Sequence, residues 1–159
     1  MYTHSMKIYS PSFGNGEPIP ARFSCEGDNI NPELIFEGVP QTAKSLILIV
    51  DDPDVPKQIR GDKHFTHWLL YNLPANLKKI DENSAPGTQG KNDTGQNVYT
   101  GPCPPTEFEP TTHRYFFKLY ALDKNLNLPQ GITQKELERA IKNHILKKAD
   151  YFGTFTRVK

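Results

Sequence analysis

Four side chains capable of binding a small ligand lie near the ends of predicted strands: Asp52, His67, His113 and Tyr115. Two imidazoles and a phenol can donate up to three hydrogen bonds to an anion, two of them charge-assisted when the rings are protonated. A carboxylate beside them would repel an anion, so Asp52 is expected to orient a histidine instead. At about 1.5–3 kcal/mol per charge-assisted bond, less the cost of association, a small anion is expected to bind with micromolar to millimolar affinity.

Each of these residues also has a plain structural explanation. Residues 51–56 (DDPDVP) taken alone are an acidic turn, although a cis bond between Asp52 and Pro53 is one way to aim the carboxylates. A lone histidine on an apolar strand face is more often a buried core residue than a ligand. The combination of two histidines, a tyrosine and an aspartate, all where strands meet turns, is what favours one shared pocket.

Strand-like segments supply the framework that must position these side chains. Turns rich in proline and glycine separate five such segments, at residues 45–50, 65–73 and 114–122, more weakly at 33–39, and at 154–159 near the C-terminus. The run at 45–50 is apolar throughout, as is typical of a strand buried on both faces.

One helix is predicted to begin at Thr133. Thr133 and Glu136 match a capping box, and apolar residues then recur at helical spacing through Ile145, with Gly153 as the expected end. Residues 77–83 are either a short helix or a loop. Because strands dominate and the helix lies near the C-terminus, the chain is predicted to be a single, mainly β domain over residues 1–159 with two packed sheets.

Alternation along the strands assigns the candidate residues to faces. Asp52 continues one face of the 45–50 strand, and Asp51 continues the other. His64 falls on the face opposite to His67, so the His-x-x-His spacing is a poor metal pair in an extended strand. The residues expected to share the face of His67 are Phe65, Leu69 and Tyr71.

Composition excludes several classes of protein. The chain has 159 residues, a formal net charge of +1 and 36% hydrophobic residues. It lacks the basic stripe of a nucleic-acid binder and an apolar run of the length that spans a membrane. The polar start, residues 1–11, does not resemble a secretory signal, so a cytoplasmic location is expected.

The two cysteines, Cys25 and Cys103, leave two alternatives open. Two reduced thiols are the commoner state in an intracellular chain, and this is the state expected here. A bridge between them would close a long loop and contribute about 4–5 kcal/mol by the chain-entropy estimate. Two ligands alone cannot complete a structural zinc site, and no cofactor is expected.

Four short motifs follow one another along the chain. They are residues 52–56 (DPDVP), 67–74 (HWLLYNLP), 101–105 (GPCPP) and 113–115 (HRY). In this order they resemble the phosphatidylethanolamine-binding protein (PEBP) family, also described as Raf-kinase-inhibitor-like, in its bacterial and archaeal branch. The resemblance extends from about residue 8 to the C-terminus, with supporting stretches at residues 19–23, 25–29, 31–32 and 91–93.

The resemblance implies a fold and a site. The expected fold is a PEBP-like antiparallel β-sandwich with a large and a small sheet and a C-terminal helix. The expected site is a small surface pocket for phosphate-like or other anionic groups, carboxylates included. The family's pocket residues fall here on Asp52, His67, Pro105, His113 and Tyr115, with Cys103 near the mouth.

The family offers several partners, and the sequence departs from its pattern at the pocket rim. Members are described as inhibitors of kinases or serine proteases, as lipid or nucleotide binders and as signalling proteins, and bacterial members often form homodimers. The link at residues 106–112 is longer than usual, and Phe65 stands where eukaryotic members have a tryptophan. The longer link reshapes one rim of the pocket and so bears on the choice of partner.

A non-enzymatic anion-binding module that regulates a partner is therefore the leading hypothesis. The sequence has no Gly-x-Ser-x-Gly elbow and no Walker or Rossmann glycine pattern. One alternative is a metal-dependent enzyme with Asp52, His67 and His113 as ligands. Another is a hydrolase in which His67 or His113 activates Cys103 or water.

Overall fold

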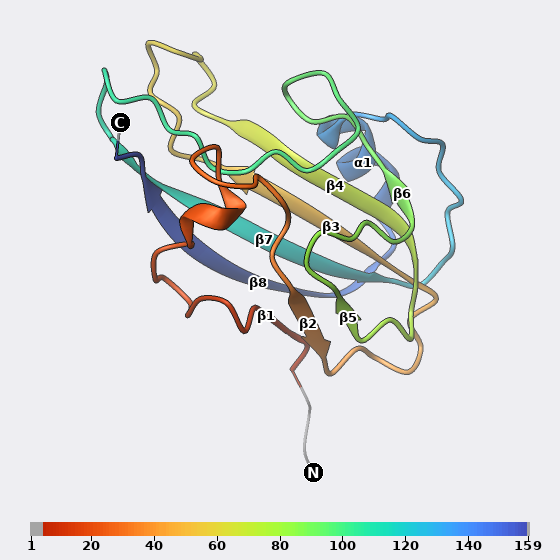
Figure 1. Cartoon of the computed structure of the whole chain (residues 1–159). Helices are drawn as coiled ribbons and strands as arrows, with labels where there is room; N and C mark the ends of the chain where they lie inside the picture. The colour runs from red at the N-terminus through yellow and green to blue at the C-terminus, as the bar shows by residue number, and fades with distance from the viewer. Residues whose placement is uncertain (1–4, 159) are drawn as a thin grey trace.

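Two antiparallel sheets and one helix form three layers. The computed structural model of the chain describes residues 5–158 (Figure 1). The five-stranded sheet has the order β6-β4-β3-β7-β8, and the three-stranded sheet has the order β1-β2-β5. The strands are β1 (Lys7–Tyr9), β2 (Leu34–Glu37), β3 (Ser45–Asp52), β4 (Phe65–Pro74), β5 (Lys79–Ile80), β6 (Thr88–Gln89), β7 (Thr112–Leu122) and β8 (Ile145–Thr156). The helices are α1 (Gln134–Ile141) and the 3-10 turn η1 (Ala21–Phe23).

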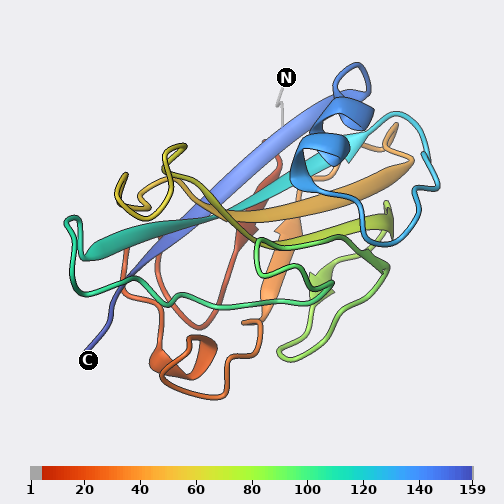
Figure 2. The same ribbon diagram turned by 90° about the horizontal axis from the view of Figure 1, so that it is seen from above.

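The central strand β3 separates two hydrophobic cores. All eight of its residues are buried, as its continuous apolar run predicts. Leu48 and Val50 pack against the small sheet, whereas Ile47 and Ile49 pack against α1. Figure 2 shows α1 on one side of the large sheet and the small sheet on the other. The predicted β-rich sandwich of a large and a small sheet is confirmed.

The helix begins where the sequence predicts but is shorter than expected. Thr133 and Glu136 form the capping box. The last helical residue is Ile141, whose carbonyl accepts a hydrogen bond from the His144 N–H in a closing turn. The expected continuation toward Gly153 is wrong, because β8 pairs with β7 along nearly its whole length. The backbone N–H and C=O groups along the edge of β7 need hydrogen-bond partners, and β8 supplies them. This pairing stabilises the strand more than the helical spacing of apolar residues stabilises a longer helix.

A bulge in β4 changes which side chains share the face of His67. Val50 pairs with Trp68 and Asp51 pairs with Thr66, which leaves His67 as the extra residue. His67 and Trp68 both lie on the small-sheet side, whereas Leu69 and Tyr71 belong to the core beneath α1. The expectation that His67 shares a face with Leu69 and Tyr71 is therefore wrong, whereas Phe65 does lie beside His67.

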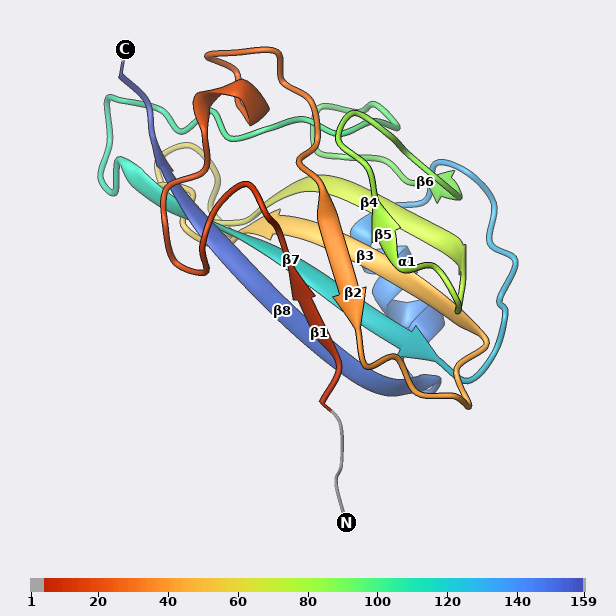
Figure 3. The same cartoon turned by 60° about the horizontal axis from the view of Figure 1, so that its bottom comes forward.

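Several loops meet at one end of the large sheet. Figures 1 and 3 show the loop 53–64, the loop that precedes β7, and η1 gathered near the same strand ends. Within residues 5–158, the single α-helix has eight residues and is not of the length or hydrophobicity that a membrane span requires. The peptide bond Asp52–Pro53 is trans, and the cis bond found in the described chain is Glu109–Pro110.

Candidate functional site

A cavity of about 220 Å³ opens at this end of the sheet. All six residues singled out in the sequence line it: Asp52, His67, Cys103, Pro105, His113 and Tyr115. Val55, Gly101 and Pro104 also line it; they belong to the sequence motifs but were not assigned to the site, and Phe65 was expected only on the face of His67. No sequence pattern indicated Ile59, Thr94 or Thr100. The structure thus brings together side chains from three strands and two loops.

His113 has a hydrogen-bond acceptor at each ring nitrogen. Its Nδ1 donates to Asp52 Oδ2 at 2.7 Å, and its Nε2 donates to the Pro110 carbonyl at 2.9 Å. Burial alone would lower the pKa of His113, but the hydrogen bond and charge of Asp52 outweigh burial and raise it. His113 is therefore a buried imidazolium whose two N–H groups are already used.

Both carboxylate oxygens of Asp52 accept hydrogen bonds, one of them from His113. Its second oxygen, Oδ1, accepts the Asp54 N–H at 2.7 Å. The Asp54 carboxylate in turn accepts two guanidinium bonds and the backbone N–H of Arg114, each at 2.9 Å, which ties the turn after β3 to the start of β7. These bonds from Arg114 hold the pKa of Asp54 below its usual value. Asp52 therefore fits the orienting role expected for it.

His67 keeps one nitrogen free for a ligand. Its Nδ1–H donates to the Thr100 carbonyl at 2.7 Å, which fixes the tautomer and leaves Nε2 without a hydrogen bond to the described part of the protein. Burial lowers the pKa of His67, and the Thr100 bond offsets this only in part. The ring is therefore neutral near pH 7, and Nε2 is an acceptor.

The ring of Tyr115 contacts both histidines. Its ring meets His67 edge-on with centroids 5.2 Å apart and stacks on His113 at 6.2 Å. The hydroxyl has no hydrogen-bond partner among residues 5–158. Burial, followed by the charge of Asp52, raises the pKa of this phenol, so the hydroxyl stays protonated and can donate.

The cavity therefore presents fewer free donors than the sequence analysis expects. Both ring nitrogens of His113 are already hydrogen-bonded within the protein. Only the His67 imidazole and the Tyr115 phenol therefore remain to bind a ligand, instead of two imidazoles and a phenol. Within the described residues, no group of three or more His, Cys, Asp or Glu side chains is arranged to hold a metal ion. This geometry gives no support to the metal-site alternative built on Asp52, His67 and His113.

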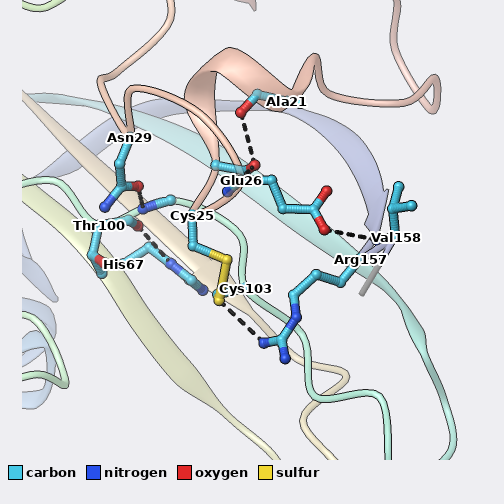
Figure 4. The surroundings of a disulfide bond; sticks show 11 residues. Ala21, Cys25, Glu26, Asn29, His67, Thr100, Cys103, Arg157 and Val158 are labelled. Atoms are coloured by element: carbon cyan, nitrogen blue, oxygen red, sulfur yellow. Dashed lines mark hydrogen bonds between the residues drawn. A yellow bond between two sulfur atoms is a disulfide. The ribbon is translucent and has the colours of Figure 1, made fainter.

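The two cysteines form a disulfide, so the expectation of two reduced thiols is wrong (Figure 4). Two hydrogen bonds bring the loops together: Cys25 N–H to the Pro102 carbonyl at 3.1 Å and Gly101 N–H to Asn29 Oδ1 at 2.7 Å. A sequence separation of 78 residues gives no hint of this contact. While the disulfide is intact, Cys103 has no thiol for the hydrolase alternative.

A second, polar cavity of about 610 Å³ lies beneath α1 on the other face of β3. Asp51 Oδ2 accepts hydrogen bonds there from His64, Lys118 and Gln134 at 2.9–3.0 Å. Burial favours a higher pKa for Asp51, but these three donors outweigh it and lower the pKa. Most of its charged groups pair with one another, and its buried atom without a hydrogen bond is the carboxylate oxygen Asp51 Oδ1, so this cavity is a weaker candidate for an anion.

The fold and site define a β-sandwich protein with a small pocket at the strand ends of its large sheet. The family model of the phosphatidylethanolamine-binding proteins matches residues 9–156. A UPF0098 protein of Chlamydia pneumoniae is 43% identical over 153 residues, covering 96% of this chain and 99% of the relative. A UPF0098 protein of Pyrococcus horikoshii is 43% identical and covers 96% and 77%. The chain belongs to the phosphatidylethanolamine-binding protein family.

Solved structures agree with this assignment. The crystal structure of a PEBP homologue from Chlamydia trachomatis superposes with a TM-score of 0.91 at 41% identity, covering 96% of this chain and 98% of that one. YbcL of Escherichia coli, described as a member of the mammalian PEBP family, shares the fold with a TM-score of 0.85 at 24% identity, over 97% and 99% of the two chains. Membership of this family supports a binding module.

Proposed function

We propose that the cavity binds a small anionic group, phosphate-like or carboxylate, and that the protein is a non-enzymatic binding module. One observation carries the proposal. His67 Nε2 and the Tyr115 hydroxyl line the same cavity, and neither has a partner in the described part of the protein. Both side chains are buried and line the cavity, so their unpartnered polar atoms indicate where a ligand's polar atoms belong.

The chemistry of these two groups favours an anion over a cation. Because His113 and Asp52 form an ion pair, their charges nearly cancel, and Asp52 has both oxygens occupied. Tyr115 supplies an O–H donor. His67 supplies a nitrogen that takes up a proton when an anion approaches, or that accepts the O–H of a singly protonated phosphate.

The walls strengthen these few polar contacts. Val55, Phe65 and Pro104 are among the residues that exclude water around the ligand. In such surroundings hydrogen bonds are stronger than in bulk water. Two charge-assisted bonds of about 1.5–3 kcal/mol each, less the association cost, place the affinity in the millimolar to micromolar range. A volume of about 220 Å³ suits a headgroup-sized ligand.

As a regulator, the module is proposed to act on a protein partner of the class that the family resemblance implies, a kinase or a serine protease. The longer segment 106–112 and the exposed Phe108 lie on the loop that carries the pocket wall and would shape this contact. Inhibition assays with wild-type protein and with Tyr115→Phe test whether the partner uses the pocket. The cytoplasm is proposed as the location, and cell fractionation tests it.

Titration of ¹⁵N-labelled protein with inorganic phosphate and with phosphoethanolamine, at constant ionic strength, tests the binding proposal. We expect saturable shifts of the Tyr115 and His67 signals, and their loss in His67→Gln. His144→Gln is the matched control, because His144 does not line the cavity and its ring is hydrogen-bonded to Asp123. Shifts confined to surface lysines, or equal responses of both variants, would contradict the proposal.

A further inference from the structure

The disulfide lies at the rim of the ligand cavity. Cys25 and Cys103 are both exposed, and Cys103 also lines the cavity. Figure 4 shows the disulfide beside the hydrogen bond from His67 to the Thr100 carbonyl, three residues before Cys103. Exposed disulfides are open to attack by thiols, unlike those sealed in a core.

A cation is held against one of the two sulfurs. The Arg157 guanidinium donates to Cys103 Sγ at 3.3 Å. The chain end that carries Arg157 is fixed by the Val158 N–H, which donates to Glu26 Oε2 at 2.7 Å. A guanidinium beside a sulfur stabilises the thiolate that forms when the disulfide opens. The two sulfurs are thus unequal, and Cys103 is the better leaving group.

The disulfide also anchors a stretch of the cavity wall that little else holds. Within the described chain, residues 103–109 make no backbone hydrogen bond. Pro104 and Pro105 have no N–H to offer. The flanking carbonyls are fixed, Pro102 by the Cys25 N–H and Pro110 by His113. Opening the disulfide leaves the wall residues between these two points attached by packing and by the Arg157 contact.

We propose that Cys25–Cys103 is a thiol-exchange site whose redox state sets the affinity of the cavity. A thiol attacks Cys25 Sγ, Cys103 leaves as a thiolate beside Arg157, and the freed wall binds the anion more weakly. The coupling to the anion rests on the proposed function, whereas the exchange chemistry does not. The reductant is a dithiol of low molecular mass or a protein dithiol.

The exchange is balanced over two steps. The first thiolate of the dithiol forms a bond to Cys25 Sγ, and the electron pair of the broken bond goes to Cys103 Sγ. The second thiolate then attacks the sulfur of the first, forms the dithiol's own disulfide and releases Cys25 as a thiolate. The dithiol loses two electrons and two protons. The protein gains the two electrons, and the protons pass to its sulfurs or to solvent.

Linkage makes the coupling reciprocal. Once the disulfide is open, residues 103–109 must become ordered again before they can contact a ligand. The reduced protein therefore binds the anion less tightly. If the anion binds the oxidised form about tenfold more tightly, saturating anion must lower the midpoint potential of the disulfide by about 30 mV. A purely structural disulfide shows neither effect.

The first experiment follows reduction of the folded full chain. The protein is incubated with dithiothreitol or with glutathione, quenched with iodoacetamide and mapped by mass spectrometry, while amide spectra monitor the fold. We expect two alkylated cysteines without unfolding, glutathione trapped mainly on Cys25, and reduction slowed several-fold in Arg157→Gln. Arg139→Gln, an exposed charge change on α1, should behave as wild type. Three results would contradict the proposed exchange site: reduction only after unfolding, glutathione trapped mainly on Cys103, or equal reduction rates for Arg157→Gln and Arg139→Gln.

The second experiment measures phosphate affinity in the oxidised protein, the reduced protein and the variant Cys25→Ser/Cys103→Ser. We expect the reduced and double-serine proteins to bind about tenfold more weakly than the oxidised protein. Equal affinities would overturn the coupling. If phosphate binds none of the three, the proposed function fails, and the reduction experiment alone still decides the exchange site.

Discussion

Removing the hydroxyl of Tyr115 should weaken anion binding, whereas removing the hydroxyl of the partly buried Tyr99 should lower stability. The Tyr115 hydroxyl has no partner within residues 5–158, whereas the Tyr99 hydroxyl donates to the Phe23 carbonyl at 2.7 Å. Tyr115→Phe removes a donor to the anion, worth about 1.5–3 kcal/mol, so phosphate affinity should fall about 10- to 150-fold. Its free energy of unfolding should change by less than about 0.5 kcal/mol.

Tyr99→Phe should show the reverse pattern. It leaves the Phe23 carbonyl without its donor, which costs about 1–3 kcal/mol of stability. Tyr99 does not line the anion cavity, so phosphate affinity should stay within about twofold of wild type. Urea denaturation and phosphate titration on the same two variants measure both quantities. Normal phosphate binding by Tyr115→Phe, or a joint loss of affinity and stability in both variants, would show that the Tyr115 hydroxyl is not the donor to the anion.

Three further predictions follow from the same contacts. Sulfate, whose charge is constant over about pH 5 to 8, should bind more tightly as pH falls, by up to tenfold per unit, because binding raises the lowered pKa of His67; a flat profile contradicts this. Asp52→Asn should cost about 1.5–3 kcal/mol of stability. Because the pKa of His113 is raised on folding, that loss should be complete below about pH 6.5 and shrink as pH rises through the folded pKa; a pH-independent loss in denaturation curves contradicts it. Cys25→Ser/Cys103→Ser should lower the free energy of unfolding by about 4–5 kcal/mol, and a loss below about 1 kcal/mol would contradict a native crosslink.

The framework of the fold could be predicted because local sequence and tertiary packing agree there. The run at residues 45–50 is apolar on both faces, and β3 is buried on both faces. The alternation that separates Asp51 from Asp52 also holds, and it puts the two carboxylates in different cavities. Thr133 with Glu136 marked the start of α1 through a strictly local capping contact.

The errors arise where distant residues decide the local structure. The end of α1 depends on the pairing of β8 with β7. The bulge at His67 depends on the register between β3 and β4. Neither appears in the spacing of apolar residues within one segment.

The placement of the candidate site residues could be expected from the family motifs, but their bonding could not. Nothing in the sequence reveals that Pro110 occupies the second nitrogen of His113, or that Thr100 fixes the tautomer of His67. The disulfide was missed for the same reason, since Cys25 and Cys103 meet only after the two loops have packed.

A crystal structure of the full chain grown with phosphate would show whether the cavity binds an anion. We expect a phosphate with oxygens within about 2.6–3.2 Å of both the Tyr115 hydroxyl and His67 Nε2, while His113 keeps its bonds to Asp52 and Pro110. A phosphate seated instead against Arg60 or Lys118 in the cavity beneath α1, with the first cavity holding only water, would contradict this expectation.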